Sequence, residues 1–115
     1  MIKIEAVIRS TKFHLVQHAL ADIGIHTFSA FDIKLAGLHR GHSTVGGRPG
    51  SFKASDLIAK TNVVVLCHDR EKEGIIKAIV DAAKTGLKGD GLISVYPIGS
   101  LTKIRNGATD EQALR

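Results

Sequence analysis

The sequence predicts an α+β domain built from two consecutive strand–helix–strand units. Segments in which apolar residues alternate flank segments in which apolar residues recur every three to four positions, and this order occurs twice. Only 4% of the residues are aromatic, so the core must be built mainly from Ile, Val, Leu and Ala. The 115 residues are enough for a single domain with a substantial core, and we expect one domain over residues 1–115.

The first unit opens with a strand and an amphipathic helix. Residues 2–9 carry Ile or Ala at every second position, which predicts a half-buried strand. Ser10 and Thr11 are good helix N-caps, and the helix is expected from about Lys12 to Ile23, with Gly24 as its left-handed stop. The apolar stripe of this helix consists of Phe13, Val16, Ala19, Leu20 and Ile23.

A second strand candidate and a long loop follow. Residues 25–36 are mostly apolar, and the strand is expected to end at Gly37. Residues 37–55 hold five glycines, a proline and the basic residues Arg40, Arg48 and Lys53. A structureless segment of this length is uncommon in a compact domain and is usually functional or disordered. We expect a long flexible loop that meets a partner or ligand, although a loop without a role has the same composition.

The second unit repeats the order of the first. Residues 60–68 contain a β-branched run that is typical of a central, buried strand. Asp69 can cap the helix expected from Arg70 to Ala83, and Leu92 to Tyr96 form the next strand, closed by Pro97. Residues 103–105 suggest a short strand piece before a polar tail. The stripe of the second helix consists of Ile75, Ile76, Ile79, Val80 and Ala83.

Together the two units predict a four-stranded antiparallel sheet with both helices on one face, the ferredoxin-like βαββαβ plan. The other face of the sheet would be uncovered, and Val7, Phe31 and Ile33 make it partly apolar. A monomer would expose this patch to water, so we expect oligomerisation to cover it.

Composition and charge narrow the classes of function. The net charge is +5, but the sixteen Lys and Arg are scattered, and one Tyr and four Phe supply no stacking platform. A small anionic ligand therefore fits better than a nucleic acid. The only cysteine, Cys67, lies in an apolar run; we expect a core thiol in a reducing cytoplasm rather than a nucleophile paired with His68. The sequence suggests neither a signal peptide nor a transmembrane helix, which needs ~20 apolar residues.

The glycine turn, which we define as residues 85–91, joins the second helix to the strand that follows. Its sequence is Thr85-Gly86-Leu87-Lys88-Gly89-Asp90-Gly91. Glycines at this density allow positive φ and a close approach to another molecule. An ordinary helix-to-strand turn has a similar composition, so the turn alone leaves phosphate binding and a plain connection both open.

Several short motifs occur in order along the chain: residues 4–9, residues 19–25, Gly41-His42, the glycine turn, and Ile104-Arg105-Asn106-Gly107. In content and spacing they resemble the PII signal-transduction proteins over nearly the whole chain. The resemblance implies a ferredoxin-like homotrimer that is not an enzyme. It also implies that adenine nucleotides such as ATP or ADP bind in clefts between subunits, and that the 37–55 loop engages a protein partner, such as a membrane transporter, an enzyme or a regulator.

The resemblance assigns phosphate contacts to two segments. The glycine turn would wrap the phosphates through backbone N–H groups, which implicates Gly89, Asp90 and Gly91. Lys103 and Arg105 correspond to a basic pair that contacts the phosphates from a neighbouring subunit.

Five further positions follow from the resemblance. The adenine would lie against Ser29 and Leu66. At the base of the long loop, Gly37, Leu38 and His39 would line the phosphates.

The chain departs from the family at three of these positions. Leu92 follows the glycine turn where members usually carry a lysine, and Leu38 replaces an arginine. Fewer cations weaken the case for a triphosphate, although Lys88, Arg40 or His39 could compensate, and AMP or a cyclic nucleotide becomes a candidate.

A third departure concerns magnesium and 2-oxoglutarate. His39 replaces the glutamine that helps to hold both in the family, so magnesium is left open. Lys60 matches a lysine that can pair with the 2-oxoglutarate carboxylate, but one partner is insufficient. The loop has no tyrosine, since Tyr96 is the only one in the chain, and regulation by uridylylation is not expected.

Two other classes of function remain open. His39 and His42 suggest a metal-responsive trimeric binding protein, but no motif offers three ligands at zinc spacing. The residues available for catalysis are Asp32, Asp69, His68 and Ser94. No nucleophile–base spacing stands out among them, so we assign no catalytic or metal-binding residues.

Overall fold

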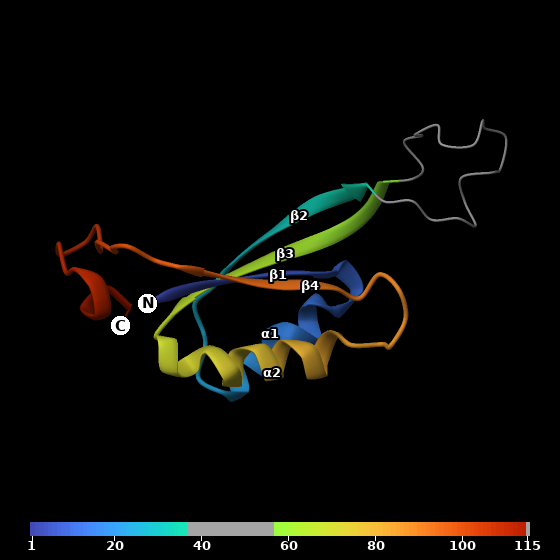
Figure 1. The fold of residues 1–115 in the computed structure, drawn as a ribbon, viewed down its shortest axis with the longest axis horizontal. Helices are drawn as coiled ribbons and strands as arrows, with labels where there is room; N and C mark the ends of the chain where they lie inside the picture. The colour runs from blue at the N-terminus through green and yellow to red at the C-terminus, as the bar shows by residue number, and fades with distance from the viewer. Residues whose placement is uncertain (37–56, 115) are drawn as a thin grey trace, which may run out of the picture.

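The computed structural model describes residues 1–36 and 57–114. A four-stranded antiparallel sheet lies above two helices that both pack on its lower face (Figure 1), which confirms the ferredoxin-like βαββαβ fold. The strand order is β2-β3-β1-β4, so β1 and β3 are central. The elements are β1 Ile2–Arg9, α1 Phe13–Asp22, β2 Ser29–Ala36, β3 Leu57–Cys67, α2 Lys72–Ala83 and β4 Gly91–Pro97.

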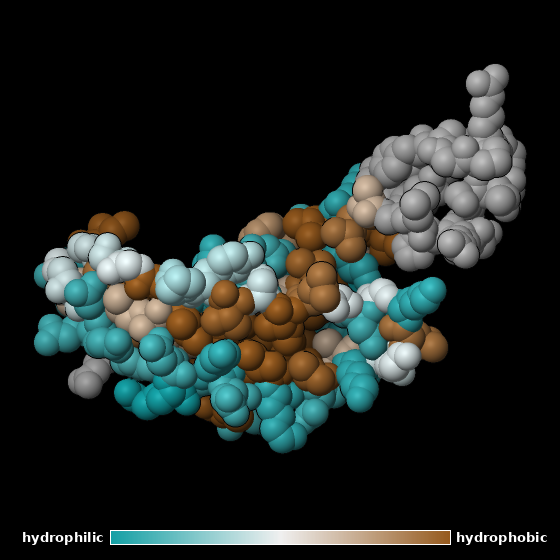
Figure 2. All heavy atoms as spheres, viewed as in Figure 1, coloured by the Kyte–Doolittle hydropathy of each residue, from teal (hydrophilic) through white to brown (hydrophobic). Residues whose placement is uncertain are grey.

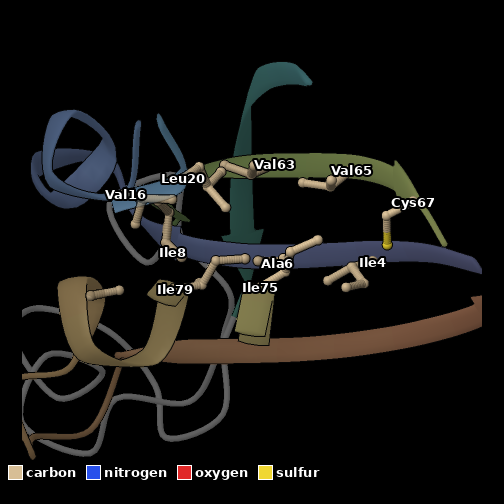
Figure 3. Packing of buried hydrophobic residues seen from close by; sticks show 11 residues of the cluster. Ile4, Ala6, Ile8, Val16, Leu20, Val63, Val65, Cys67, Ile75 and Ile79 are labelled. Carbon is tan, nitrogen blue, oxygen red and sulfur yellow. The ribbon is translucent and has the colours of Figure 1, made fainter. Parts of the chain in front are cut away.

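The core lies between the sheet and the helices (Figure 3). Alternate residues of β1 and β3 face the helices, so Ile4 pairs with Val65 and Ala6 with Val63 on the buried side. Cys67 is 2% exposed in this core, as expected, and burial raises the pKa of its thiol to about 11. The buried apolar residues are Ile4, Ala6, Ile8, Val16, Leu20, Val63, Val65, Cys67, Ile75, Ile79 and Ala83.

The predicted helix N-caps are wrong, and two of the candidates, Ser10 and Asp69, have partners far away in the sequence. A 3₁₀ turn over Ser10–Lys12 precedes α1, and the Ser10 hydroxyl accepts a hydrogen bond from Thr61 at 3.0 Å. Another 3₁₀ turn, Asp69–Glu71, precedes α2, and the Asp69 carboxylate accepts from the Met1 amine at 2.7 Å. The helix α1 begins without a side-chain cap, whereas the 3₁₀ turn before α2 has a capping box in which the His68 N–H donates to the Glu71 carboxylate at 3.0 Å.

The helix α1 ends as predicted, but the strand β2 begins later than predicted. Gly24 adopts a φ of +86°, and its N–H donates to the Ala21 carbonyl at 2.9 Å. The Ile25 N–H also bonds back to the helix, to the Leu20 carbonyl at 2.8 Å. These bonds hold the chain to the helix end, so β2 begins at Ser29 rather than at Ile25.

The predicted strand piece over residues 103–105 is wrong. The Gly107 N–H donates to the Lys103 carbonyl at 2.8 Å, and Thr102 pairs with Thr109 in an isolated bridge. The segment is therefore a tight reversal, and a short 3₁₀ helix, Asp110–Leu114, follows it.

The upper face of the sheet carries apolar side chains, as the sequence predicted. Pairing places Leu92, Val7, Asn62 and Phe31 in one row across β4, β1, β3 and β2. Leu92 is 81% exposed and Phe31 50% exposed. Apolar side chains also gather in a band over β4 and α2 (Figure 2), where Val80 and Val95 are exposed.

Candidate functional site

The glycine turn is organised by the carboxylate of Asp90. One oxygen accepts the backbone N–H groups of Thr85 and Gly86, each at 2.9 Å, and the other accepts the Thr85 hydroxyl. The Thr85 hydroxyl and these N–H groups hold the pKa of Asp90 well below its usual range. Asp90 therefore remains an anion and closes the turn upon itself.

Glycine is required at the end of this turn. Gly91 has a φ of +109°, and a Cβ placed on it would lie 1.7 Å from the Val7 carbonyl oxygen of the neighbouring strand. The close approach of the two backbones lets β4 start its pairing with β1 at Gly91, opposite Ile8.

Two cations lie beside the turn. The Arg9 guanidinium donates from Nη2 to the Lys88 carbonyl at 2.7 Å and from Nε to Asp90 at 3.4 Å. The Lys60 ammonium donates to the Gly89 carbonyl, so this lysine contacts the backbone of the turn directly. Sequence reasoning gave Arg9 no role in the site, although Arg9 closes the motif over residues 4–9 that carries the family resemblance.

The predicted phosphate residues at this end of the sheet lie together. Asp90, Gly91 and Leu92 line a small pocket of about 160 Å³, beside Lys84 and the apolar side chains of Ile79 and Val80. Gly89 lies next to the Arg9 guanidinium, since a Cβ on Gly89 would be 3.2 Å from Nη2.

A larger pocket, of about 430 Å³, contains the other predicted residues. Ser29 on β2, Leu66 on β3 and Lys103 near the C-terminus all line it. Arg105, two residues further on, is exposed in the reversal and does not line this pocket. The remaining lining residues are Thr27, Phe28, Val64, Leu101, Thr102, Ala113 and Leu114.

Contacts near the amino terminus fix the last wall of this pocket. The Glu111 carboxylate of the C-terminal 3₁₀ helix contacts Nδ1 of His68 and lies 3.7 Å from the Met1 amine. This anchors the segment that supplies Ala113 and Leu114 to the pocket. Sequence reasoning missed this contact because its members are far apart along the chain.

The two pockets lie at opposite ends of β1. Leu66 pairs with Lys3, whereas Gly91 pairs with Ile8, five residues further along the strand. At ~3.4 Å per residue, that separation is about 17 Å. One chain therefore does not bring the predicted adenine residues next to the predicted phosphate turn.

Some predictions lie outside the described residues. These are the 37–55 loop, together with Gly37, Leu38 and His39 at its base and with His42. Within residues 1–36 and 57–114, no three His, Cys, Asp or Glu side chains come together in a group suited to a metal ion. No helix in the same ranges is long and apolar enough to cross a membrane.

Comparisons with known proteins agree with the fold and the motifs. The family model for nitrogen regulatory protein P-II matches residues 1–108. A nitrogen regulatory protein P-II of Pasteurella multocida is 32% identical over 114 residues, with 99% of this chain and all of the relative covered. One of Mesorhizobium japonicum is 35% identical over 114 residues, with the same coverage. A crystal structure of Arabidopsis thaliana PII bound to citrate superposes with a TM-score of 0.80 at 25% identity, covering 99% of this chain and 89% of that one.

The family model matches residues 1–108, and the relatives are more than 30% identical to this chain. These matches establish membership of the family as well as a shared fold. They confirm the resemblance that was drawn from the motifs, and with it the expectation of a signal transducer that is not an enzyme. The chain belongs to the nitrogen regulatory protein P-II family.

Proposed function

We propose that this protein binds an adenine nucleotide, and that it reports cellular energy state to a membrane transporter or an enzyme through its 37–55 loop. The observation that carries the proposal is the pocket of about 430 Å³ in which Ser29, Leu66 and Lys103 meet. These three residues come from distant parts of the chain; the family resemblance implicates Ser29 and Leu66 in holding the adenine and Lys103 in contacting the phosphates. A cytoplasmic location is part of the proposal and fits the core thiol of Cys67.

The pocket and the turn divide the work of binding a nucleotide. Leu66 and Val64 offer an apolar wall to a base, and Lys103 adds a positive charge at the rim. The glycine turn offers backbone N–H groups to phosphates, in which Gly89, Asp90 and Gly91 would take part. Arg105 and the net charge of +5 also favour an anionic ligand.

The separation of the two pockets supports a site shared between copies of the chain. A nucleotide that contacts both sets of residues needs the turn of one copy beside the pocket of another. The exposed apolar row on the open sheet face, with Phe31 and Leu92, offers a surface for such assembly. A homotrimer with nucleotides between subunits accounts for both observations.

The residues at the turn favour a ligand with few phosphates. Leu92 stands where the family usually carries a lysine, so this position supplies no positive charge. The Leu92 side chain is 81% exposed. ADP and AMP therefore belong in any binding experiment beside ATP, and magnesium is an addition to test. The metal-responsive alternative depended on His39 and His42, and no observation among the described residues favours it.

Isothermal titration calorimetry tests the proposal with ATP, ADP, AMP, cyclic AMP and adenosine, each with and without magnesium. At least one nucleotide should bind in the micromolar range. Lys103→Ala or Arg105→Ala should weaken the binding roughly 10- to 100-fold, since a hydrogen bond to a charged group contributes ~1.5–3 kcal/mol.

Lys77→Gln is the matched control. This substitution also removes one positive charge, but Lys77 pairs with Asp81 on the exposed side of α2. It should leave the affinity unchanged. Failure of every adenine nucleotide to bind would refute the proposed function.

A further inference from the structure

We propose that Arg9 and Lys60, which form a cation pair beside the glycine turn, are positioning residues that orient the backbone of the turn for anion binding. The inference rests on the proposed function and deepens it. The two side chains belong to strands of the sheet and contact the turn. The ligand that the turn would bind is a phosphate group.

The cation pair holds two consecutive carbonyl groups of the turn. Arg9 donates to the Lys88 carbonyl at 2.7 Å, and Lys60 donates to the Gly89 carbonyl. In a planar trans peptide the C=O and the next N–H point in opposite directions. The N–H groups of Gly89 and Asp90 therefore point away from the two cations, and successive amides aimed to one side make an anion site.

The arrangement also explains how two like charges tolerate each other. Arg9 and Lys60 face each other directly in the β1–β3 register, a pairing that is unfavourable between strands. Lys60 is only 2% exposed, and burial followed by repulsion from Arg9 lowers the pKa of its ammonium. The carbonyl oxygens of the turn and the Asp90 carboxylate, which lies beside Arg9, offset part of this repulsion.

Gly89 makes the contact with Arg9 sterically possible. Its φ is +98°, and a Cβ on it would lie 3.2 Å from the Arg9 Nη2 atom. Absence of a side chain there lets the guanidinium lie against the turn.

Variants of Arg9 and Lys60 distinguish a positioning role from an effect of charge alone and from a general loss of stability. Arg9→Lys keeps the positive charge. It lacks the planar guanidinium that donates to the Lys88 carbonyl and to Asp90 at the same time. If Arg9 acts by charge alone, this variant binds like the wild type. If Arg9 positions the turn, Arg9→Lys loses phosphate affinity, Arg9→Gln and Lys60→Gln lose more, and the affinity for adenosine stays the same in all three.

The experiment measures the dissociation constants of ADP, adenosine and inorganic triphosphate by calorimetry for the wild type, these variants and the Lys77→Gln control. Arg9→Lys should weaken ADP and triphosphate roughly fivefold, and Arg9→Gln or Lys60→Gln more than tenfold. Adenosine should change less than twofold, and the control should match the wild type. In ¹⁵N–¹H NMR spectra, the Gly89 and Asp90 amides should shift on addition of triphosphate to the wild type and not to Arg9→Gln.

Each outcome decides between the two proposals. If triphosphate binds and depends on Arg9 but no adenine ligand binds, the inference holds and the proposed function falls. If ADP binds and folded Arg9 and Lys60 variants keep its full affinity, the inference is overturned and the proposed function stands. Binding of neither triphosphate nor ADP to the wild type overturns both.

Discussion

Asp90 shows how one side chain can set the shape of the glycine turn. Its carboxylate accepts hydrogen bonds from Thr85 and Gly86 and pairs with Arg9. Sequence and family resemblance placed Asp90 among the phosphate ligands. In the structure the Asp90 carboxylate bonds to the turn itself and to Arg9. Of this residue, only the backbone N–H is therefore suited to contact a phosphate.

The pH dependence of stability should reveal the role of Asp90. Its pKa lies below the unfolded value of ~3.9, so the stabilisation is complete above that value and is lost as the pH falls through the folded pKa. Urea denaturation from pH 7 to pH 2 should therefore show a stability advantage of the wild type over Asp90→Asn that is constant at neutral pH and shrinks below about pH 4.

Asp81→Asn is the control, since Asp81 is exposed and pairs with Lys77 one turn earlier on α2. Its difference from the wild type should be small at every pH. A constant advantage over Asp90→Asn down to pH 2 would contradict the role assigned to this carboxylate.

At the scale of elements, the start of β4 depends on a glycine. Gly91→Ala would place a methyl group against the Val7 carbonyl and strain a residue at a φ of +109°. We expect a loss of about 1–3 kcal/mol in the free energy of unfolding. Thermal and urea denaturation measure this loss directly.

Gly74→Ala is the matched control for that substitution. Gly74 lies within α2, and a Cβ there would meet nothing within 4 Å. Alanine should stabilise the helix by about 0.5–1 kcal/mol. Equal stability of Gly91→Ala and the wild type would show that the turn does not need its glycine.

Elements whose residues have a clear apolar period were predicted well. β1 runs over Ile2–Arg9 as expected, and both helices begin and end within two residues of their predicted bounds. Burial of one face fixes such elements, and periodicity reports it directly. The C-terminal reversal was missed because the bridge between Thr102 and Thr109 leaves no such period.

Contacts between distant residues set the limits of the sequence analysis. Ser10 and Asp69 were expected to cap helices, but their partners, Thr61 and Met1, lie in other strands or at the chain end. The cation pair arises from the β1–β3 register, which places Arg9 opposite Lys60. Register is a tertiary property, so the local sequence could name the glycine turn but not the side chains that orient it.

At the scale of the whole molecule, the central claim is a nucleotide site shared between copies. The turn at one end of β1 and the pocket at the other end lie about 17 Å apart, at ~3.4 Å per residue. A site inside one chain would need these ends to meet. A site between chains needs only that one copy's turn faces another's pocket.

Complementation between two defective chains tests that claim most directly. Arg9→Gln damages the turn and Lys103→Ala damages the pocket, so each protein alone should bind ADP weakly. After the two are unfolded, mixed equally and refolded, about one quarter of the sites should combine an intact turn with an intact pocket from different copies. Calorimetry should then recover wild-type affinity at about that fraction of sites, in assemblies whose mass by light scattering is three chains. A mixture that binds no better than its components would contradict a shared site.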